Sequence, residues 1–455
     1  MTDSQQILIK GARVIDPADG TDEVGDVLVR DGVIAAKGRA VSAPDGALVV
    51  NGTGQVLAPG FIDLHAHLRE PGREDRETVA TGAAAAARGG FTTVCCMPNT
   101  EPAIDSAMMV EFIAAKAREA GPVRMLAIGA VTRGRAGKEL AEMEEMASAG
   151  AVAFSDDGSP VATGHLMQMA LTYASELGLP VIDHCEDHSI TRGLGVHEGW
   201  VASRLGLEGY PSAGEESTMA RDIALAELTG GHFHAAHVST AGGVELVRQA
   251  KARGIRVTAE ATPHHLTMSE EWVLGVHGAV APANALELSA YDTMAKVSPP
   301  LRTPADRAAL IDALRDGTID CIATDHAPHT FADKTVPFDE AMVGISVLET
   351  ALGSLMGLVH AGSLSLPTLV HRLTVAPAMV FGGALAALGS LAVGAPADIV
   401  LFDPDEEWAV DPAAFASKGR NTPLAGDRLK GRVTLTVAQG IIAFDAAGLT
   451  HGTSA

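Results

Sequence analysis

The sequence has few aromatic residues and few positive charges, and each shortage excludes a class of protein. Phe, Trp and Tyr make up 4% of the 455 residues while hydrophobic residues make up 47%, so the core must be mainly aliphatic. Lys and Arg number 33 against 56 Asp and Glu, which gives a formal net charge of -23. That balance argues against a nucleic-acid surface or an anionic membrane as partner, because both attract basic proteins.

Cysteine is scarce as well, and long apolar runs are missing. The four cysteines show no CxxC spacing and lie in apolar, strand-like runs, which indicates reduced core residues. No apolar stretch reaches the roughly 18 residues of a membrane span. The N-terminal MTDSQQILIK has neither the basic nor the apolar region of a signal peptide. We therefore expect a cytoplasmic protein that spans no membrane.

Between residues 56 and 384, short β-rich runs alternate with Ala- and Leu-rich segments of helical period. Segments such as AMMVEFIAAKAREAG and VELVRQAKARG place apolar residues at i, i+3 and i+4 and end on glycine. The β-rich runs are continuously apolar, which is typical of parallel strands covered by helices. Eight strand–helix units predict an α/β fold, a (β/α)8 barrel of TIM type. The runs span 56–65, 91–99, 123–131, 151–156, 179–185, 232–238, 255–261 and 319–325.

The two ends of the chain, residues 1–55 and 385–455, show alternating and turn-rich patterns instead. ILIKGARVID near one end and VTLTVAQGIIAFD near the other are typical of antiparallel strands. Neither end has enough apolar residues for a core of its own, so we predict one small β-sandwich domain built from both. The long connection 269–299 follows the seventh strand, and we expect it to order partly over the site or at a subunit contact.

Residues that can bind metals follow five of the predicted strands, at the end where barrel enzymes place their chemistry. His65 and His67 lie two positions apart in one strand, so both imidazoles leave the same face and can chelate one ion. Chance placement of so many ligand-type residues at one end of a barrel is improbable, and we predict a metal centre there. The candidates are His65, His67, the pair Asp156 and Asp157, His184, His237 and Asp325.

These motifs resemble a known family. GFIDLHAHLREPG resembles the HxH signature of the amidohydrolase superfamily, and REPGREDRETVATGAAAAARGGFTTVCCMPNTEP is similar to dihydroorotases. AFSDDGSP, HCED and ATDHAPH strengthen the match, which covers the whole chain. The resemblance implies a zinc-dependent hydrolase that interconverts dihydroorotate and N-carbamoyl-L-aspartate in pyrimidine biosynthesis. It implies one or two zinc ions in each subunit, and we favour two.

The fourth strand indicates which subclass this chain resembles. Many superfamily members bridge two metals with a carboxylated lysine there, but this sequence has no lysine between Lys138 and Lys251. Type I dihydroorotases have aspartate instead, and a carboxylate offers zinc the same two-oxygen geometry. The match to their SDDG motif assigns Asp157 as the bridging ligand. Asp156, on the opposite side of the strand, is then expected to be structural.

The expected mechanism follows from these ligands. Metal coordination lowers the pKa of bound water toward ~7, which supplies hydroxide near neutral pH. Asp325 is placed to take the water's proton and deliver it to the leaving nitrogen. Arg69 leaves the same face as the HxH pair, and its fork suits the substrate's carboxylate. The resemblance adds Asn99 from MPNT and His329 from DHAPH as substrate-binding residues.

Some residues depart from the family pattern or are not needed by it. Ser298 in KVSPPLR stands where most relatives carry Asn, and Arg76 replaces a common lysine. The change at Ser298 is expected to weaken a substrate contact. His264 and His265 in TPHHL follow the seventh strand, but neither is needed as a ligand.

Two other functions stay open on the sequence alone. Hydantoinases, dihydropyrimidinases and allantoinases share the fold and chemistry, but their substrates lack the ring carboxylate and they typically use the missing lysine. A non-catalytic scaffold for a transcarbamoylase is the second alternative. The sequence keeps all the ligand positions, which argues against it. We expect a homo-oligomer acting on a small molecule, with an aspartate transcarbamoylase as a possible partner.

Overall fold

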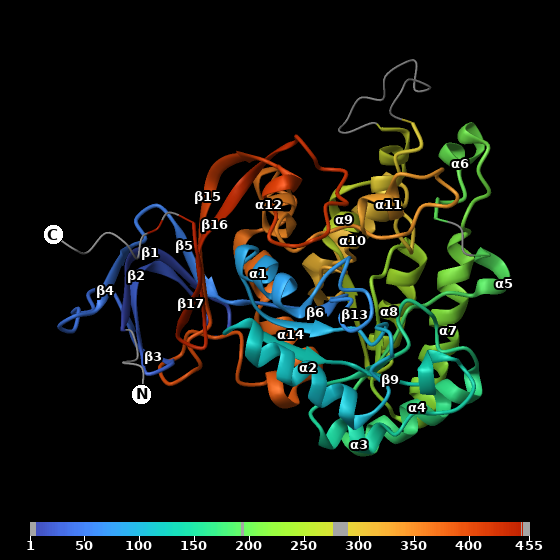
Figure 1. Ribbon diagram of the computed structural model, residues 1–455, viewed down its shortest axis with the longest axis horizontal. Coiled ribbons are helices and arrows are strands. Elements are labelled where there is room, and N and C mark those ends of the chain that lie inside the picture. Colours follow the sequence, from blue (N-terminus) through green and yellow to red (C-terminus); the bar gives the residue numbers. More distant parts are fainter. Residues whose placement is uncertain (1–5, 193–194, 276–289, 447, 449–455) are drawn as a thin grey trace.

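The computed structural model describes residues 6–192, 195–275, 290–446 and 448, and Figure 1 shows them arranged in two parts. A barrel surrounded by helices forms one part, and strands from both chain ends form a sheet beside it. The predicted α/β barrel with a β-sandwich domain from both termini is confirmed. No helix within these ranges is long and apolar enough to cross a membrane.

The barrel strands are parallel, and each lies within its predicted run except the first, which extends one residue further, to Ala66. The third strand is split into two short pieces, and the ring closes where Ala66 pairs with His326. At the same seam the Asp325 N–H donates to the His65 carbonyl at 2.9 Å. In barrel order the strands are β6 (Phe61–Ala66), β7 (Phe91–Cys96), β8 (Arg124–Ala127) with β9 (Gly129–Ala130), β10 (Phe154–Ser155), β11 (Val181–Asp183), β12 (Phe233–Ala235), β13 (Val257–Ala261) and β14 (Cys321–Ile322).

Helices cover the outside of the barrel, and local sequence signals determine where they end. Helix α10 (Pro304–Asp316) begins with a capping box between Thr303 and Asp306. It ends at Gly317, whose φ of 88° would strain any residue with a side chain. The others are α1 (Val79–Arg88), α2 (Ala107–Ala120), α3 (Met143–Ser148), α4 (Gly164–Leu177), α5 (His188–Thr191), α6 (Trp200–Leu205), α7 (Ser212–Thr229), α8 (Ala241–Ala252), α9 (Pro263–Thr267), α11 (Phe331–Lys334), α12 (Ala351–His360), α13 (Leu366–Leu373) and α14 (Val375–Phe381).

Aliphatic side chains fill the inside of the barrel. Leu64 of β6 and Ile182 of β11 are fully buried there, together with Ala323 after β14. Helix α14 packs Val380 and Phe381 against this interior from the end where the strands begin. The barrel is therefore a packed core, and polar side chains that face inward at the other end share a site above it.

The terminal sheet has its own core and differs from the prediction at one boundary. Val56–Pro59, which we assigned to the first barrel strand, pairs with strands from both chain ends. Gly60 lies between this strand and β6. The position requires glycine, because a side chain there would overlap Thr92. The sheet order is β17-β16-β15-β5-β1-β2-β3, with β4 pairing β1. The strands are β1 (Ile7–Asp16), β2 (Thr21–Arg30), β3 (Val33–Gly38), β4 (Leu48–Asn51), β5 (Val56–Pro59), β15 (Ile399–Ala409), β16 (Arg428–Ala438) and β17 (Ile441–Asp445).

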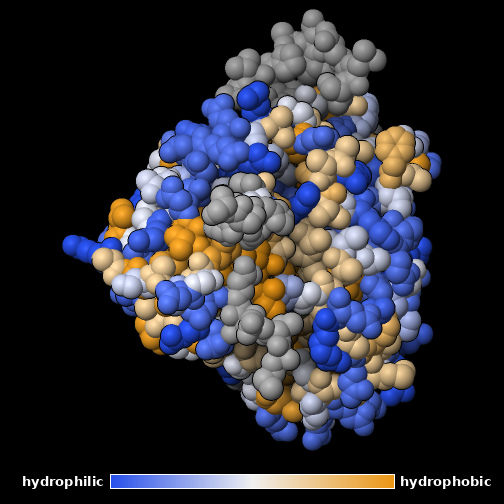
Figure 2. All heavy atoms as spheres, turned by 60° about the vertical axis from the view of Figure 1, so that its left-hand side comes forward, coloured by the Kyte–Doolittle hydropathy of each residue, from blue (hydrophilic) through white to orange (hydrophobic). Residues whose placement is uncertain are grey.

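Hydrophilic and apolar side chains are mixed on the face of the molecule that carries the terminal sheet (Figure 2). Figure 2 brings the terminal sheet forward and shows apolar side chains gathered in the middle of that face. The terminal sheet itself exposes Val24 and Ile441, at 63% and 59% of their surface.

Within the long connection 269–299, the structure describes two single-turn helices, Glu270–Leu274 and Thr293–Ala295. Residues 276–289 lie outside the described ranges, so the expected role of this connection stays a prediction.

Candidate metal centre

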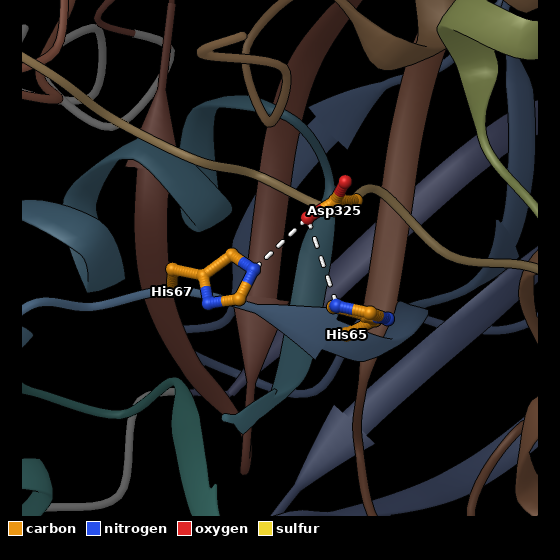
Figure 3. A group of neighbouring side chains, drawn as sticks. All are labelled: His65, His67 and Asp325. Carbon is orange, nitrogen blue, oxygen red and sulfur yellow. Dashed lines mark hydrogen bonds and ion pairs between the residues drawn. The ribbon is translucent and has the colours of Figure 1, made fainter. Parts of the chain in front are cut away.

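Histidine and aspartate side chains from two neighbouring strands meet above the barrel core. Figure 3 shows His65 of β6 and His67, which follows that strand directly, facing Asp325, which follows β14. Asp325 Oδ1 lies 3.0 Å from His67 Nε2 and 3.6 Å from His65 Nε2. One donor atom of each residue lies within 4.8 Å of the other two, which is compact enough to hold one metal ion.

Asp157 lies between this group and a second pair of histidines. Its Oδ2 is 3.4 Å from His65 Nε2 and 3.5 Å from His67 Nε2. Its Oδ1 is 3.5 Å from His184 Nδ1 and 3.4 Å from His237 Nε2. Each oxygen of one carboxylate therefore faces a different pair of imidazoles, which is the arrangement needed to bridge two ions. The structure thus brings together all the residues predicted as ligands.

Asp156 points the other way and is fully engaged with the protein. Its Oδ1 accepts the Thr132 N–H at 3.0 Å, and its Oδ2 accepts the Thr132 hydroxyl at 2.5 Å. Arg135 donates two hydrogen bonds to the Asp156 carbonyl. The two neighbours differ because successive side chains of an extended strand leave opposite faces. Asp156 joins the loops after the third and fourth strands, while the Asp157 carboxylate faces the histidines.

The charges at this centre are suited to cations. Burial raises the pKa of Asp157, but the imidazoles of His65, His184 and His237 that surround its carboxylate hold that pKa well below its usual range. Burial lowers the pKa of His184, yet Asp157 and Glu186 outweigh this and raise it to about 10. The carboxylates therefore stay ionised and draw positive charge toward themselves, which divalent metals would supply in place of protons.

Two polar atoms at the centre have no hydrogen-bond partner within the described part of the chain. They are His65 Nε2 and Asp157 Oδ1, and both are buried. Unpaired buried polar atoms are costly, so a native structure normally supplies a partner for them. Four imidazoles and two carboxylates form a nitrogen and oxygen donor set that zinc accepts, so the residues present fit this ion.

A further set of hydrogen bonds orients the metal-facing histidines. His65 Nδ1 lies 2.6 Å from Glu260 Oε1, and His67 Nδ1 lies 2.9 Å from Asn99 Oδ1. His184 Nε2 lies 3.1 Å from Glu186 Oε2. If each of these nitrogens donates its proton, the other ring nitrogen is left free to bind an ion.

The sequence prediction missed two of these partners, Glu260 and Glu186. Both are almost fully buried, with 1% and 5% of their surface exposed. The available signal was a lone carboxylate within an apolar strand, IRVTAEA, and a second one in HCED after the fifth strand. A buried, charged residue needs a partner, and here each partner is a ring nitrogen that faces away from the metal centre.

The backbone is unusual at three of the site residues. Arg69, His237 and Asp325 have positive φ values of 63°, 30° and 46°. Residues other than glycine rarely adopt this region, and the cost is tolerated where the surrounding structure requires it. All three lie two or three residues after the end of a barrel strand, where the chain turns from the strand into the rim loop.

The three predicted substrate-binding residues lie at the same rim. Arg69 is 9% exposed, and burial lowers its pKa to about 10, so it remains charged. Its Nε donates to the Pro328 carbonyl at 3.2 Å, and its Nη2 lies 3.5 Å from His329 Nε2. Burial, followed by the charge of Arg69, lowers the pKa of His329 to about 2, so this imidazole is neutral. The guanidinium thus contacts two neutral groups and keeps its full charge.

His264 differs from its neighbour His265 in a way that the sequence does not reveal. His265 Nδ1 pairs with Thr262 Oγ1 at 2.7 Å, and its Nε2 donates to the Pro299 carbonyl at 3.0 Å. Neither ring nitrogen of His264 has a partner within the described residues, although the side chain is 2% exposed. His264 follows β13, between the strands that carry His237 and Asp325, and it therefore borders the metal centre.

A family model and the curated relatives agree on the family, and the solved structures agree on the fold. A family model described as dihydro-orotase-like matches residues 54–242. A dihydroorotase from Pelotomaculum thermopropionicum is 52% identical over 436 residues, which cover 96% of this chain and 97% of the relative. One from Anaeromyxobacter dehalogenans is 50% identical over 440 residues, which cover 96% of this chain and 98% of the relative. Among solved structures, an L-hydantoinase (dihydropyrimidinase) from Arthrobacter aurescens superposes with a TM-score of 0.82 at 26% identity, covering 97% of this chain and 96% of that one.

The geometry predicts opposite results for two neighbouring substitutions. Asp157→Ala should lose at least one metal ion per chain, because one carboxylate faces both pairs of histidines. Asp156→Ala should keep its metal and instead lower the free energy of unfolding by about 1–3 kcal/mol, since the buried Thr132 groups lose their acceptor. Metal analysis and thermal unfolding of both variants test this. The reverse pattern would show that Asp156 is the ligand.

Proposed function

This chain belongs to the dihydroorotase family, and we propose that its barrel rim interconverts dihydroorotate and N-carbamoyl-L-aspartate with two bound zinc ions. The observation that carries the proposal is the carboxylate of Asp157, whose two oxygens face separate pairs of histidines. Next to it lies a buried, charged arginine, Arg69, which is suited to the carboxylate of the substrate. A steady-state assay on dihydroorotate, hydantoin, dihydrouracil and allantoin, with metal analysis of the same sample, tests the proposal.

The metal ions would be held from both sides of the barrel axis. His65 and His67 would hold one ion, His184 and His237 the other, with Asp157 between them and Asp325 beside the first. When bound, zinc polarises a carbonyl and acidifies coordinated water. Asp325 Oδ1 lies against His67 Nε2 and faces the same centre, so it is placed to accept the proton of the attacking water. It then delivers that proton to the ring nitrogen as the amide bond breaks.

The residues at the rim of the barrel would orient the substrate. Arg69 would pair with the ring carboxylate, because a guanidinium presents two parallel N–H donors to two oxygens. Asn99 lies beside the metal centre with its Oδ1 on His67 Nδ1. Its amide group can then donate to the substrate while its oxygen orients a metal ligand. His329 contacts Arg69 and would complete this pocket as a neutral imidazole.

The two alternative functions are less well supported. Solved hydantoinase and dihydropyrimidinase structures share the fold, but those compared are 21–26% identical in sequence, far less than the dihydroorotases. Their substrates lack the ring carboxylate that Arg69 suits. A non-catalytic scaffold would have no need for the ligand set, which is complete here. We extend the proposal to a cytoplasmic homo-oligomer, and sedimentation with and without an aspartate transcarbamoylase tests its assembly.

Removing the metal should abolish activity and weaken the fold together. Without cations, the buried carboxylates and imidazoles lose their partner, and a ligand that binds only the folded state stabilises it. We expect dialysis against a chelator to remove two zinc ions per chain, lower the melting temperature and stop dihydroorotate turnover, all reversed by zinc. Full activity in protein shown to be metal-free would contradict the proposed centre.

Arg69→Met should separate substrate binding from metal binding. Losing a charge-assisted hydrogen bond costs about 1.5–3 kcal/mol, so kcat/KM for dihydroorotate should fall about 10-fold to 150-fold. Zinc content should stay unchanged, since guanidinium is not a metal ligand. Any residual turnover of dihydrouracil, which has no carboxylate, should hardly change. Equal losses on both substrates would make Arg69 a structural residue and remove this argument for the substrate.

A further inference from the structure

A segment from the far end of the chain lies against the rim of the barrel. Residues 411–427, between β15 and β16, leave the terminal sheet and run toward the loops that follow β14. The sequence assigns this stretch to the β-sandwich domain, and the structure shows that part of it contacts the barrel. We name residues 416–421 the strap. Its backbone is tied to the rim where the Ser346 N–H donates to the Asn421 carbonyl at 2.8 Å.

Asn421 uses its whole side chain to hold the loop that carries His329. Its Oδ1 accepts the His329 N–H at 2.9 Å and the Ser346 hydroxyl at 2.8 Å. Its Nδ2 donates to the Ala327 carbonyl at 2.9 Å and to the Gly344 carbonyl at 3.0 Å. The side chain is 2% exposed, so all of its hydrogen-bonding capacity is spent on two neighbouring loops.

Gly419 brings the strap into direct contact with Pro328. A Cβ atom at Gly419 would lie 2.5 Å from Pro328 Cβ and 2.2 Å from Ser346 Oγ, so only glycine fits. The Pro328 carbonyl is the group that accepts the hydrogen bond from Arg69 Nε. The strap therefore packs on the peptide that holds Arg69 on one side, and it bonds to the backbone of His329 on the other.

The strap is also fixed at its other end. The Ser417 hydroxyl donates to Glu77 Oε2, and the Lys418 N–H donates to Glu77 Oε1 at 3.2 Å. Glu77 Oε2 lies 3.3 Å from His326 Nε2, and the His326 carbonyl accepts the His67 N–H at 2.8 Å. The hydrogen bonds that link the strap to Glu77 and Glu77 to His326 are all buried or half-buried, so the strap has one defined position relative to the rim.

We propose that Asn421 is a positioning residue, which sets the relative placement of Arg69 and His329 and so determines how tightly the carboxylate of the substrate binds. The inference rests on the proposed role of Arg69 and His329 as carboxylate-binding residues. Asn421 does not contact the metal ligands' ring nitrogens or the reacting atoms. Its effect should therefore fall on substrate binding, while metal binding and the chemical step are left intact.

Asn421→Ala should raise KM for dihydroorotate about 10-fold while kcat changes about 3-fold or less, the pattern expected when uniform binding is lost. Zinc content should equal that of the unaltered protein. Inhibition by orotate, which carries the ring carboxylate, should weaken in parallel with KM. Inhibition by dihydrouracil, which lacks it, should stay the same. Arg420→Ala is the matched control, because Arg420 is the exposed neighbour of Asn421 and should leave KM unchanged.

Ser346→Ala provides a milder variant that removes one hydrogen bond to Asn421 and should raise KM in the same direction by a smaller factor. The proposal is overturned if both variants bind orotate as well as Arg420→Ala does, or if they weaken orotate and dihydrouracil equally. Arg69→Met in the same series distinguishes an error in the carboxylate-binding site from an error in the role of the strap. If Arg69→Met leaves KM unchanged, the carboxylate site is wrong; if it raises KM while Asn421→Ala does not, the strap alone is wrong.

Discussion

The carboxylate of Asp157 is the constraint on which the rest of the site depends. It is almost fully buried, it stays ionised, and its two oxygens face histidines from opposite sides of the barrel axis. An isolated charge at that depth would destabilise the fold, so the surrounding residues must supply compensating charge. Four histidines at the ends of three strands provide it through protons or through metal ions, and the proposed chemistry uses the second option.

Support for this arrangement comes from outside the ligand set. Glu260, Asn99 and Glu186 each hold the outer nitrogen of one histidine, so the inner nitrogen is aimed at the centre. The barrel thereby fixes the metal-facing groups, while the strap reaches over from the terminal sheet to the loop that carries His329. The ring nitrogens of the metal-facing histidines and the loop that carries His329 are thus held by different side chains, which is why substitutions at Asp157 and at Asn421 should affect metal binding and substrate recognition separately.

Much of this fold could be predicted from the sequence because strand and helix periods are local signals. Seven of the eight barrel strands lie within the predicted runs and the first exceeds its run by one residue, but the run 56–65 joined two strands of different sheets. The local pattern hardly separates them, since Val56–Pro59 and Phe61–Ala66 both form strands and only Gly60 lies between them. The metal-binding candidates were found because barrel strands end at one rim. The partners Glu260 and Asn421 were missed because their contacts join residues 195 and 92 positions apart.

The most direct test of the central claim is anomalous X-ray diffraction at the zinc edge from crystals of the zinc-loaded protein. Two metal peaks about 3.5–4 Å apart are expected, the spacing usual for paired catalytic ions. One Asp157 oxygen should bind each ion, with His65 and His67 on one and His184 and His237 on the other. A single peak with Asp157 bound through one oxygen, or two peaks bridged by another group, would contradict the account.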